Sequence, residues 1–324
     1  MTPVPFGRFL LLERVAIGGM AEVYAAVEQG DRAGTLRAVK RILPTLAEER
    51  DLVRLFLDEA RIAVQLDHPG LVPVHELGKL SGTYYIAMDY VAGRDLRAIA
   101  ALFRGRREPV PLEFVARVVA DAADALDHAH RGRGADGAVL EVVHRDVSPA
   151  NVLVGFDGRV RVIDFGIAQA TRGRGTARSS VLRGKFGYMS PELVRGLPVD
   201  RRSDVFALGI VLHELLAGER LFTGPTELAV MERVRAADVR PPSATNPRVP
   251  PELDRLVLRA LAREPEDRFA WANELSRALR PWARKLGAGR PGVLAGLMAR
   301  WFPEELRREQ ERRARAAAHA QGVA

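Results

Sequence analysis

The chain has 324 residues, of which 47% are hydrophobic and 28% are charged, a composition typical of a folded protein with a sizeable core and not of a disordered chain. It contains no cysteine, which excludes disulfides, thiolate metal sites and thiol nucleophiles and favours a reducing compartment such as the cytoplasm. The longest run without a charged residue spans residues 147–156, about half of what a membrane-spanning helix needs, so no membrane segment is predicted.

The net charge of +8 is concentrated in two segments. Residues 165–192 carry five basic residues and one acidic residue, and residues 284–324 carry nine basic and four acidic residues. A nucleic-acid-binding protein would spread basic side chains over a folded face, so no nucleic-acid partner is predicted. Only four of the 49 basic residues are lysine, and a lysine kept in such a chain indicates a position that needs a compact ammonium group.

Hydrophobic patterning predicts strands in the first ninety residues and helices in most of the remainder. Short strands are expected within 8–42, 71–78 and 83–91, with one helix over 47–65. Beyond them, short strands are expected at 151–154 and 160–165, and helices at 112–130, 203–217, 226–237, 251–263 and 271–285. A small sheet lobe followed by a larger helical lobe is an α+β arrangement.

Four residues near the start of the chain could belong to a nucleotide site, although each also has an ordinary structural interpretation. Gly18 and Gly19 would let backbone N–H groups face phosphates, but a glycine pair between strands is also typical of a plain hairpin. Lys40 lies within a predicted strand and fits either a phosphate contact or a surface charge. Glu59 lies in the predicted helix, where most acidic residues are solvated.

The segment 144–151, HRDVSPAN, gives these positions a context. It places Asp146 and Asn151 five positions apart, and the triplet DFG follows at 164–166, at the end of another predicted strand. Two carboxylates and an amide suit a site for a nucleotide and Mg²⁺, because hard oxygen ligands bind magnesium while a second carboxylate orients a nucleophile. With the lysine and the glutamate in order upstream, this spacing is specific to one kind of chemistry.

Together these motifs resemble the eukaryotic-like (Hanks-type) Ser/Thr protein kinases of bacteria. The resemblance covers residues 8–283 and implies the bilobal protein-kinase fold, with a small β-rich N-lobe at 8–91 and a larger helical C-lobe at 92–283, followed by a basic helical tail at 284–324. It implies transfer of the γ-phosphate of ATP to hydroxyl groups of protein substrates in the cytoplasm. The implied cofactors are ATP and Mg²⁺, or Mn²⁺ in its place.

The resemblance assigns four residues to catalysis. Lys40 would bind the α- and β-phosphates while paired with Glu59, Asp146 would accept the proton of the substrate hydroxyl, and Arg145 would sense a phosphorylated activation segment. The implied metal ligands are Asn151 and Asp164.

Further positions follow from the same resemblance. The loop over the phosphates would be Ala16, Ile17, Gly18, Gly19, Met20 and Ala21. Adenine and ribose would be held by Val23, Ala38, Met88, Asp89, Val91, Asp95 and Leu153, with Met88 as the gatekeeper and residues 89–91 as the hinge. Structural roles fall to Glu192 with its partner Arg268, and to Asp204, which would anchor the catalytic loop.

Some positions depart from the family pattern. The first and third glycines of the phosphate loop are Ala16 and Ala21, and Ser148 replaces a lysine that contacts the γ-phosphate. Such a charged hydrogen bond contributes about 1.5–3 kcal/mol, so its loss predicts a roughly ten- to hundredfold slower reaction. An ATP-binding pseudokinase that acts as a signalling scaffold is the alternative, and turnover distinguishes the two.

The two basic segments carry separate predictions. Arginines surround Thr176, Ser179 and Ser180 and would stabilise a phosphate there, so autophosphorylation is expected at one or more of the three. In the tail, residues 293–302 place apolar side chains on one helical face, which predicts packing on the kinase body or against a docking partner. The helix that follows is expected to be solvated, with Glu–Arg pairs four residues apart.

Overall fold

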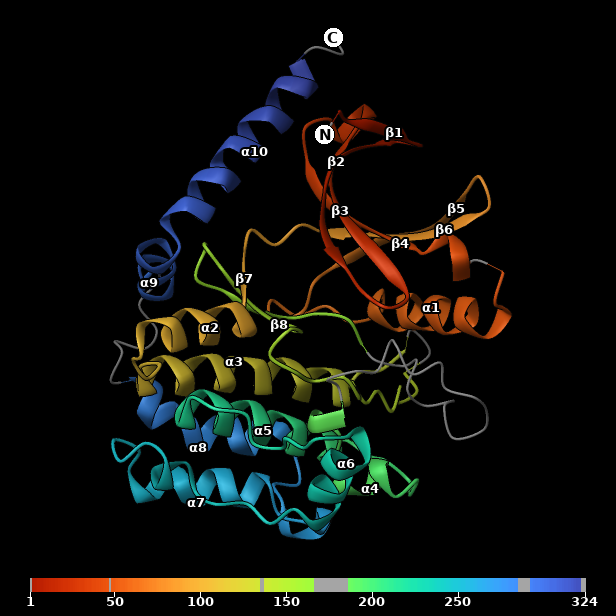
Figure 1. Ribbon diagram of the computed structural model, residues 1–324. Coiled ribbons are helices and arrows are strands. Elements are labelled where there is room, and N and C mark those ends of the chain that lie inside the picture. The colour runs from red at the N-terminus through yellow and green to blue at the C-terminus, as the bar shows by residue number, and fades with distance from the viewer. Residues whose placement is uncertain (1, 47, 135–136, 166–185, 285–291, 322–324) are drawn as a thin grey trace.

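A computed structural model describes residues 2–46, 48–134, 137–165, 186–284 and 292–321. Figure 1 shows a sheet lobe packed on a larger helical lobe, and a long helix, α10, that runs from the helical lobe towards the sheet lobe. This is the α+β, bilobal arrangement that the sequence predicts. The candidate phosphorylation sites Thr176, Ser179 and Ser180 lie outside the described residues, as does Gly166 of the DFG triplet.

In the described part of the N-lobe, six strands form one antiparallel sheet in the order β1-β2-β3-β4-β6-β5. The strands are β1 (Val4–Phe6), β2 (Phe9–Ile17), β3 (Ala21–Glu28), β4 (Leu36–Ile42), β5 (Val74–Leu80) and β6 (Thr83–Asp89). The sequence does not predict β1, because three residues are too few to show an alternating pattern. This strand pairs with the first half of β2 and lies before residue 8.

The helix α1 (Arg50–Ala63) lies against this sheet, slightly shorter than the predicted 47–65. Its residues Phe56 and Ala60 are buried with Ala21, Ile42 and Ile86 of the sheet. Burying this face brings the neighbouring Glu59 towards β4, the strand that carries Lys40.

The C-lobe is built around α5 (Arg202–Ala217), which is buried on every side, as expected for a helix that is apolar all round. The helices α3 (Leu112–His130) and α8 (Ala272–Arg284) pack on it and on each other. The other helices of this lobe are α2 (Leu96–Arg106), α4 (Pro191–Val194), α6 (Glu227–Ala236) and α7 (Pro251–Ala260). Short 3₁₀ turns occur at Gly30–Arg32, Pro44–Leu46, Phe186–Tyr188, Pro242–Ala244 and Pro265–Asp267.

Between the lobes, β7 (Gly93–Asp95), β8 (Val152–Gly155) and β9 (Val160–Val162) form a small antiparallel sheet. The helix α2 starts directly after β7, and the carboxylate of Asp95 caps it by accepting a hydrogen bond of 2.7 Å from the Ala98 N–H. The sequence does not predict α2, since only Leu96, Ile99 and Phe103 mark its buried face. The pairing of β7 with β8 and of β8 with β9 places β8 and β9 beside the segment that follows β6.

The tail forms two helices, α9 (Val293–Trp301) and α10 (Pro303–Gln321). The apolar stripe of α9 is buried on the C-lobe, which is the packing on the kinase body that the sequence predicts. The prediction of a solvated helix is wrong for one face of α10, because Arg312 and Ala316 are buried there against the N-lobe. Among the helices of the described residues, none combines the length and the apolar character that a bilayer crossing requires.

Candidate active site

Lys40 lies at the centre of the site, between two carboxylates. Its Nζ donates a hydrogen bond of 2.7 Å to Glu59 Oε1 of α1 and one of 2.8 Å to Asp164 Oδ1, just beyond β9. The side chain of Lys40 is only 11% exposed and that of Glu59 17%, so their interaction is shielded from water, whereas the Asp164 carboxylate is 35% exposed. Three residues separated by up to 124 positions in the sequence therefore meet at one ammonium group.

The electrostatics of this triad follow from its burial. Burial would lower the pKa of Lys40, but Asp164 and Glu59 outweigh it and raise that pKa above its usual value, so the ammonium stays charged. Burial together with the carboxylate of Asp164 raises the pKa of Glu59 to about 7, although the ammonium of Lys40 opposes the shift. Glu59 therefore changes its charge near neutral pH.

We expect kcat/KM for ATP to fall by about tenfold per pH unit below pH 7, because acid converts Glu59 to its neutral form and weakens its hold on Lys40. The raised pKa of Glu59 also makes the free energy of unfolding depend on pH. Folded Glu59 holds its proton more tightly than unfolded Glu59, whose pKa is 4.5, so this contribution to stability is fully present below about pH 4.5 and is lost as the pH rises through about 7. Phosphoryl transfer measured from pH 8 to pH 5.5 tests this. A flat profile in wild type, with Glu59→Gln inactive, would contradict it.

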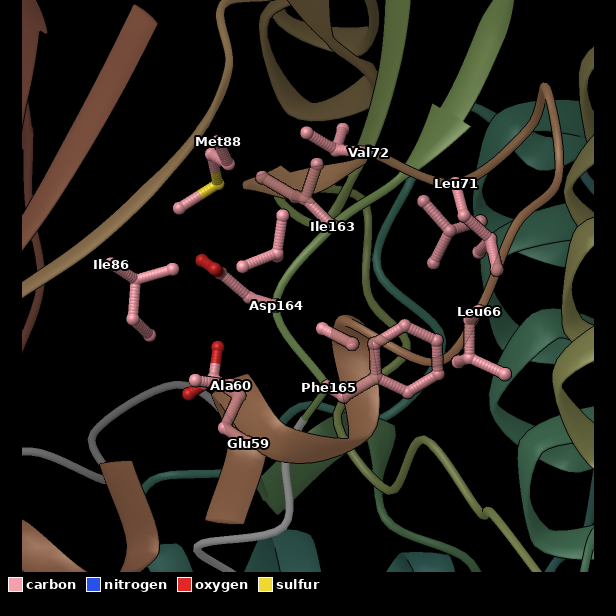
Figure 2. Close-up of a pocket in the computed structure, with 13 residues that line it drawn as sticks. Glu59, Ala60, Leu66, Leu71, Val72, Ile86, Met88, Ile163, Asp164 and Phe165 are labelled. Carbon is pink, nitrogen blue, oxygen red and sulfur yellow. The ribbon is translucent and has the colours of Figure 1, made fainter. Parts of the chain in front are cut away.

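A cavity beside this triad is lined by Glu59, Asp164 and apolar side chains. Figure 2 shows the carboxylates of Glu59 and Asp164 on the same side of this cavity, with Met88 above them and the ring of Phe165 on the other side near Leu66. Met88, at the end of β6, therefore stands at the boundary between this cavity and the hinge.

The loop at 144–151 is held by a buried aspartate from α5. Asp204 accepts hydrogen bonds from the backbone N–H groups of His144 (2.7 Å) and Arg145 (2.8 Å), and its Oδ2 lies 2.8 Å from His130 Nε2. Burial would raise the pKa of Asp204, but these hydrogen bonds and the imidazole of His130 hold it below the usual value. Arg145 has a φ of +62°, a strained conformation that the two hydrogen bonds support.

Asp146 and Asn151 point towards each other at the end of this loop. Asn151 Nδ2 donates to the Asp146 backbone carbonyl (2.8 Å) and to its Oδ2 (3.0 Å). Because the amide nitrogen faces Asp146, the amide oxygen faces the other way and can ligate a cation. Asp164 follows with a φ of +57°, and the Ile163 N–H bonds to the Asn151 carbonyl at 3.0 Å, which fixes Asp164 beside the loop.

Most of the residues predicted to hold the nucleotide lie on paired strands of the N-lobe sheet or on β8. Ala16 and Ile17 end β2, residues 18–20 form the turn, and Ala21 begins β3, with a hydrogen bond of 2.8 Å from Gly18 N–H to the Ala21 carbonyl. Val23 pairs with Lys40, Ala38 pairs with Met88, and Leu153 pairs with Asp95 across the strands. Val91 follows the hinge residue Asp89, whose carboxylate turns away to bind Arg37 at 2.5 Å.

The predicted ion pair between Glu192 and Arg268 is also present in the C-lobe. Arg268 makes two hydrogen bonds of 2.8 Å to the Glu192 carboxylate, and Ser203 donates a third to the same group. The Arg268 side chain is fully buried, yet three backbone carbonyls accept its remaining N–H groups. Burial would raise the pKa of Glu192, but Arg268 and Ser203 hold it below the usual value.

Sequence reasoning missed two histidines. His144 is completely buried, its Nε2 lies 3.0 Å from the Ile163 carbonyl, and its ring packs 4.8 Å from that of Phe165. Its place directly before Arg145 in the HRDVSPAN segment is a signal that could have identified it. His130, which also forms a hydrogen bond with Asp204, is the last residue of α3 and lies in no sequence motif that marks it.

Comparison with known proteins agrees with this geometry. Residues 9–279 match the protein kinase domain family. The tyrosine-protein kinase MasK of Myxococcus xanthus is 40% identical over 310 residues, covering 95% of this chain and 48% of MasK. The serine/threonine-protein kinase PknB of Mycolicibacterium smegmatis is 36% identical over 274 residues, covering 83% of this chain and 42% of PknB. The chain thus spans about half the length of these relatives, and the match to MasK extends past residue 283 into the tail.

A solved kinase structure is similar to this chain in fold. The kinase domain of Mycobacterium tuberculosis PknI superposes with a TM-score of 0.65 at 30% identity, covering 87% of this chain and 99% of the PknI chain. The match confirms the predicted fold, and with the sequence matches it confirms the resemblance to bacterial Hanks-type kinases. The chain belongs to the protein kinase family.

Proposed function

We propose that this chain is a Ser/Thr protein kinase that transfers the γ-phosphate of MgATP to hydroxyl groups of other proteins. The observation that carries the proposal is the ammonium of Lys40 between Glu59 and Asp164, at 2.7 and 2.8 Å. Protein kinases use ATP and a divalent cation, and they need this ion pair to orient the phosphates for an attacking oxygen. Incubating the protein with MgATP and a generic protein substrate tests the proposal directly.

In this proposal the reacting groups sit around Asp146. Its carboxylate would orient the substrate hydroxyl and accept its proton as the oxygen attacks the γ-phosphate. Asn151 holds this carboxylate from the side, at 3.0 Å, and so restricts its rotation. Lys40 would neutralise the α- and β-phosphates, and Asp204 would keep the whole loop in place through its two backbone hydrogen bonds.

The donor set fits a magnesium ion, or manganese in its place. Asp164 offers a carboxylate and Asn151 an amide oxygen, both hard ligands of the kind that Mg²⁺ prefers. The described residues include no cluster of three or more His, Cys, Asp or Glu side chains around a common point, so the nucleotide phosphates would complete the coordination. The cation would neutralise negative charge on the phosphates.

The nucleotide itself would lie between the two lobes. Adenine would contact the hinge backbone at 89–91, between the apolar side chains of Val23, Ala38 and Leu153. The turn at 16–21 would cover the phosphates. Asp95 would contact the ribose in addition to capping α2. Its Oδ1 accepts the hydrogen bond from the Ala98 N–H, and its Oδ2 accepts one from the neighbouring Arg97.

Serine and threonine are proposed as the acceptors because Pro149 stands where Ser/Thr kinases of the family carry such a residue. The names of the relatives point both ways, since PknB is named a serine/threonine kinase and MasK a tyrosine kinase. Phosphoamino-acid analysis of the labelled product separates the alternatives. Phosphotyrosine as the main product would overturn this part of the proposal.

Phosphorylation of the activation segment is a further part of the proposal. Among the described residues, the buried Nε of Arg145 has no hydrogen-bond partner, and such a donor suits a phosphate. We expect mass spectrometry of active protein to find phosphate on one or more of Thr176, Ser179 and Ser180, and none there in Asp146→Asn. Arg145→Gln should lower the activity of the phosphorylated form. An unmodified segment in fully active protein would contradict the prediction.

A pseudokinase scaffold is the second candidate, and Ser148 is the observation that favours it. The side chain is buried at the loop and is too short to supply the ammonium that most Ser/Thr kinases place there. Asp146 argues the other way, because a scaffold has no chemical need for a proton acceptor beside the metal ligands. Protein that binds MgATP but transfers no phosphate, even after treatment with a partner kinase, would establish the scaffold.

We also propose residues 8–283 as the kinase domain, with lobes divided near residue 91, and 284–324 as a separate tail. The substrates of the kinase would be proteins of the cytoplasm. That compartment supplies ATP, and its reducing environment suits a chain without cysteine. Nucleic acid is not expected as a partner, because most of the described arginines of α10 pair with acidic residues of the chain itself, namely Arg307, Arg308, Arg312 and Arg315.

A further inference from the structure

The tail is anchored to the C-lobe through α9. The Trp301 ring packs edge-on against Phe103 of α2 and Phe114 of α3, each with ring centres 4.9 Å apart. Leu294 and Met298 are buried on the same face, and the Arg94 guanidinium of β7 lies over the ring of Phe302 at 5.7 Å. Aromatic contacts of this kind add to the free energy of apolar burial, so α9 is firmly attached.

The next helix, α10, is attached to the N-lobe. Arg312 Nε donates a hydrogen bond of 2.8 Å to Glu13 of β2, and Arg315 lies 3.7 Å from the same carboxylate. One turn beyond Arg312, Ala316 is 1% exposed and is buried with Leu12 of β2 and Val27 of β3. Figure 1 shows α10 bridging the two lobes along one side of the molecule, with its far end near β1 and β2.

Between these two anchors, α10 binds the hinge. Tyr90 is the central hinge residue, and its hydroxyl donates to Glu309 Oε1 at 2.8 Å while it accepts a hydrogen bond from Arg312. The Arg312 guanidinium also lies over the Tyr90 ring and pairs with Glu309. Burial and the charge of Glu309 raise the pKa of Tyr90, so its hydroxyl remains a donor at neutral pH.

We propose that α9 and α10 form a strap that positions the hinge, and that Glu309 and Arg312 are positioning residues which set the affinity for ATP through Tyr90. The inference rests on the proposed function only in placing adenine against the hinge backbone. A rotation of one lobe relative to the other must stretch the strap, because α9 is fixed to the C-lobe and α10 to β2. Without Arg312, the acidic Glu13 and Glu309 and the Tyr90 hydroxyl lose a shared partner.

Thiol labelling measures whether the strap is docked. Since the chain contains no cysteine, Ala316→Cys and Ala317→Cys each introduce one thiol, the first on the buried face and the second on the exposed face. The thiol at 316 should react with a maleimide at least about tenfold more slowly than the thiol at 317, because labelling requires α10 to lift off. Adding Arg312→Gln should remove most of this difference. Equal rates in the two single variants would show that α10 is not docked and would overturn the proposal.

Kinetics then test what the strap does. Arg312→Gln should raise KM for ATP, and the dissociation constant of MgATP measured by calorimetry, by about fivefold or more with little change in kcat. Arg312→Lys should restore part of the affinity. The matched control is Arg313→Gln, on the exposed face of the same turn, which should leave KM unchanged.

The outcomes separate the two proposals. If Arg312→Gln frees the thiol at 316 but leaves KM and MgATP binding unchanged, α10 is only a structural brace and the positioning role is overturned. If wild type binds MgATP but transfers no phosphate, the proposed function fails while the binding constants still decide the role of the strap. If wild type binds no MgATP, both proposals fail.

Discussion

Asp146→Asn is expected to abolish detectable phosphoryl transfer while MgATP still binds. The substitution keeps the size of the side chain and a hydrogen-bonding group towards Asn151, so the loop should stay in place. It removes the proton acceptor, a contribution of typically about 10²–10⁴-fold in rate. Ser148 already predicts a slow wild-type enzyme, and a further loss of this size falls below the background of most assays. Autophosphorylation and calorimetric binding of MgATP, measured on the same preparation, check both halves of the expectation.

The matched control for this substitution is Asp157→Asn. Asp157 lies in the turn between β8 and β9, where it binds Arg161 at 2.7 Å on a partly exposed surface. Burial would raise the pKa of Asp157, but Arg161 and the Arg159 N–H hold it below the usual value, so this variant also removes a charge. It should retain wild-type transfer. Comparable transfer by Asp146→Asn and wild type would mean that Asp146 is not the proton acceptor and that the proposed chemistry is wrong.

Lys40→Arg is expected to reduce phosphoryl transfer by about a hundredfold or more. Lys40 Nζ donates two charge-assisted hydrogen bonds, and the Lys40 side chain is only 11% exposed. Each such hydrogen bond contributes about 1.5–3 kcal/mol. A guanidinium keeps the charge but is longer, planar and wider, so it cannot occupy the point between Glu59 and Asp164 that the ammonium fills.

The control here is Lys79→Arg, an equal change at an exposed lysine of β5 that lies over the ring of Tyr84. Thermal unfolding of both variants shows whether the loss arises from the site or from the fold. Lys40→Arg with near-normal activity would mean that Lys40 serves only the packing of the N-lobe.

The chemical residues of the site could be predicted because their types and spacing have few other uses. A lone Lys40 or Glu59 is ambiguous, but the two together with the HRDVSPAN segment and the DFG triplet identify one kind of site. The larger helices were predictable for a different reason, since α3 and α5 carry long apolar patterns. The short β1 and α2 were missed because a three-residue strand and a helix with few buried positions have weak patterns.

The contacts made by the tail could not be predicted from pattern. Among the side chains of α10 that the structure describes, the buried ones are Arg312 and Ala316, and neither residue type distinguishes a buried face from a solvated one. Arg312 is buried because Glu13, in a distant part of the chain, and Glu309 of the same helix compensate its charge, while the hydroxyl of Tyr90 accepts a further hydrogen bond. A helix whose buried face is polar is recognisable only once its partners are known.

The pairing of Arg312 with Glu13 also has a consequence for synthesis, because 299 positions separate the two residues. At about 5–20 residues per second, translation reaches Arg312 roughly 15–60 seconds after Glu13 has been made. During that interval the outer faces of Leu12 and Val27, which Ala316 later covers, are open to solvent or to a chaperone. The N-lobe sheet, although encoded first, therefore acquires its final packing only after the whole C-lobe has left the ribosome.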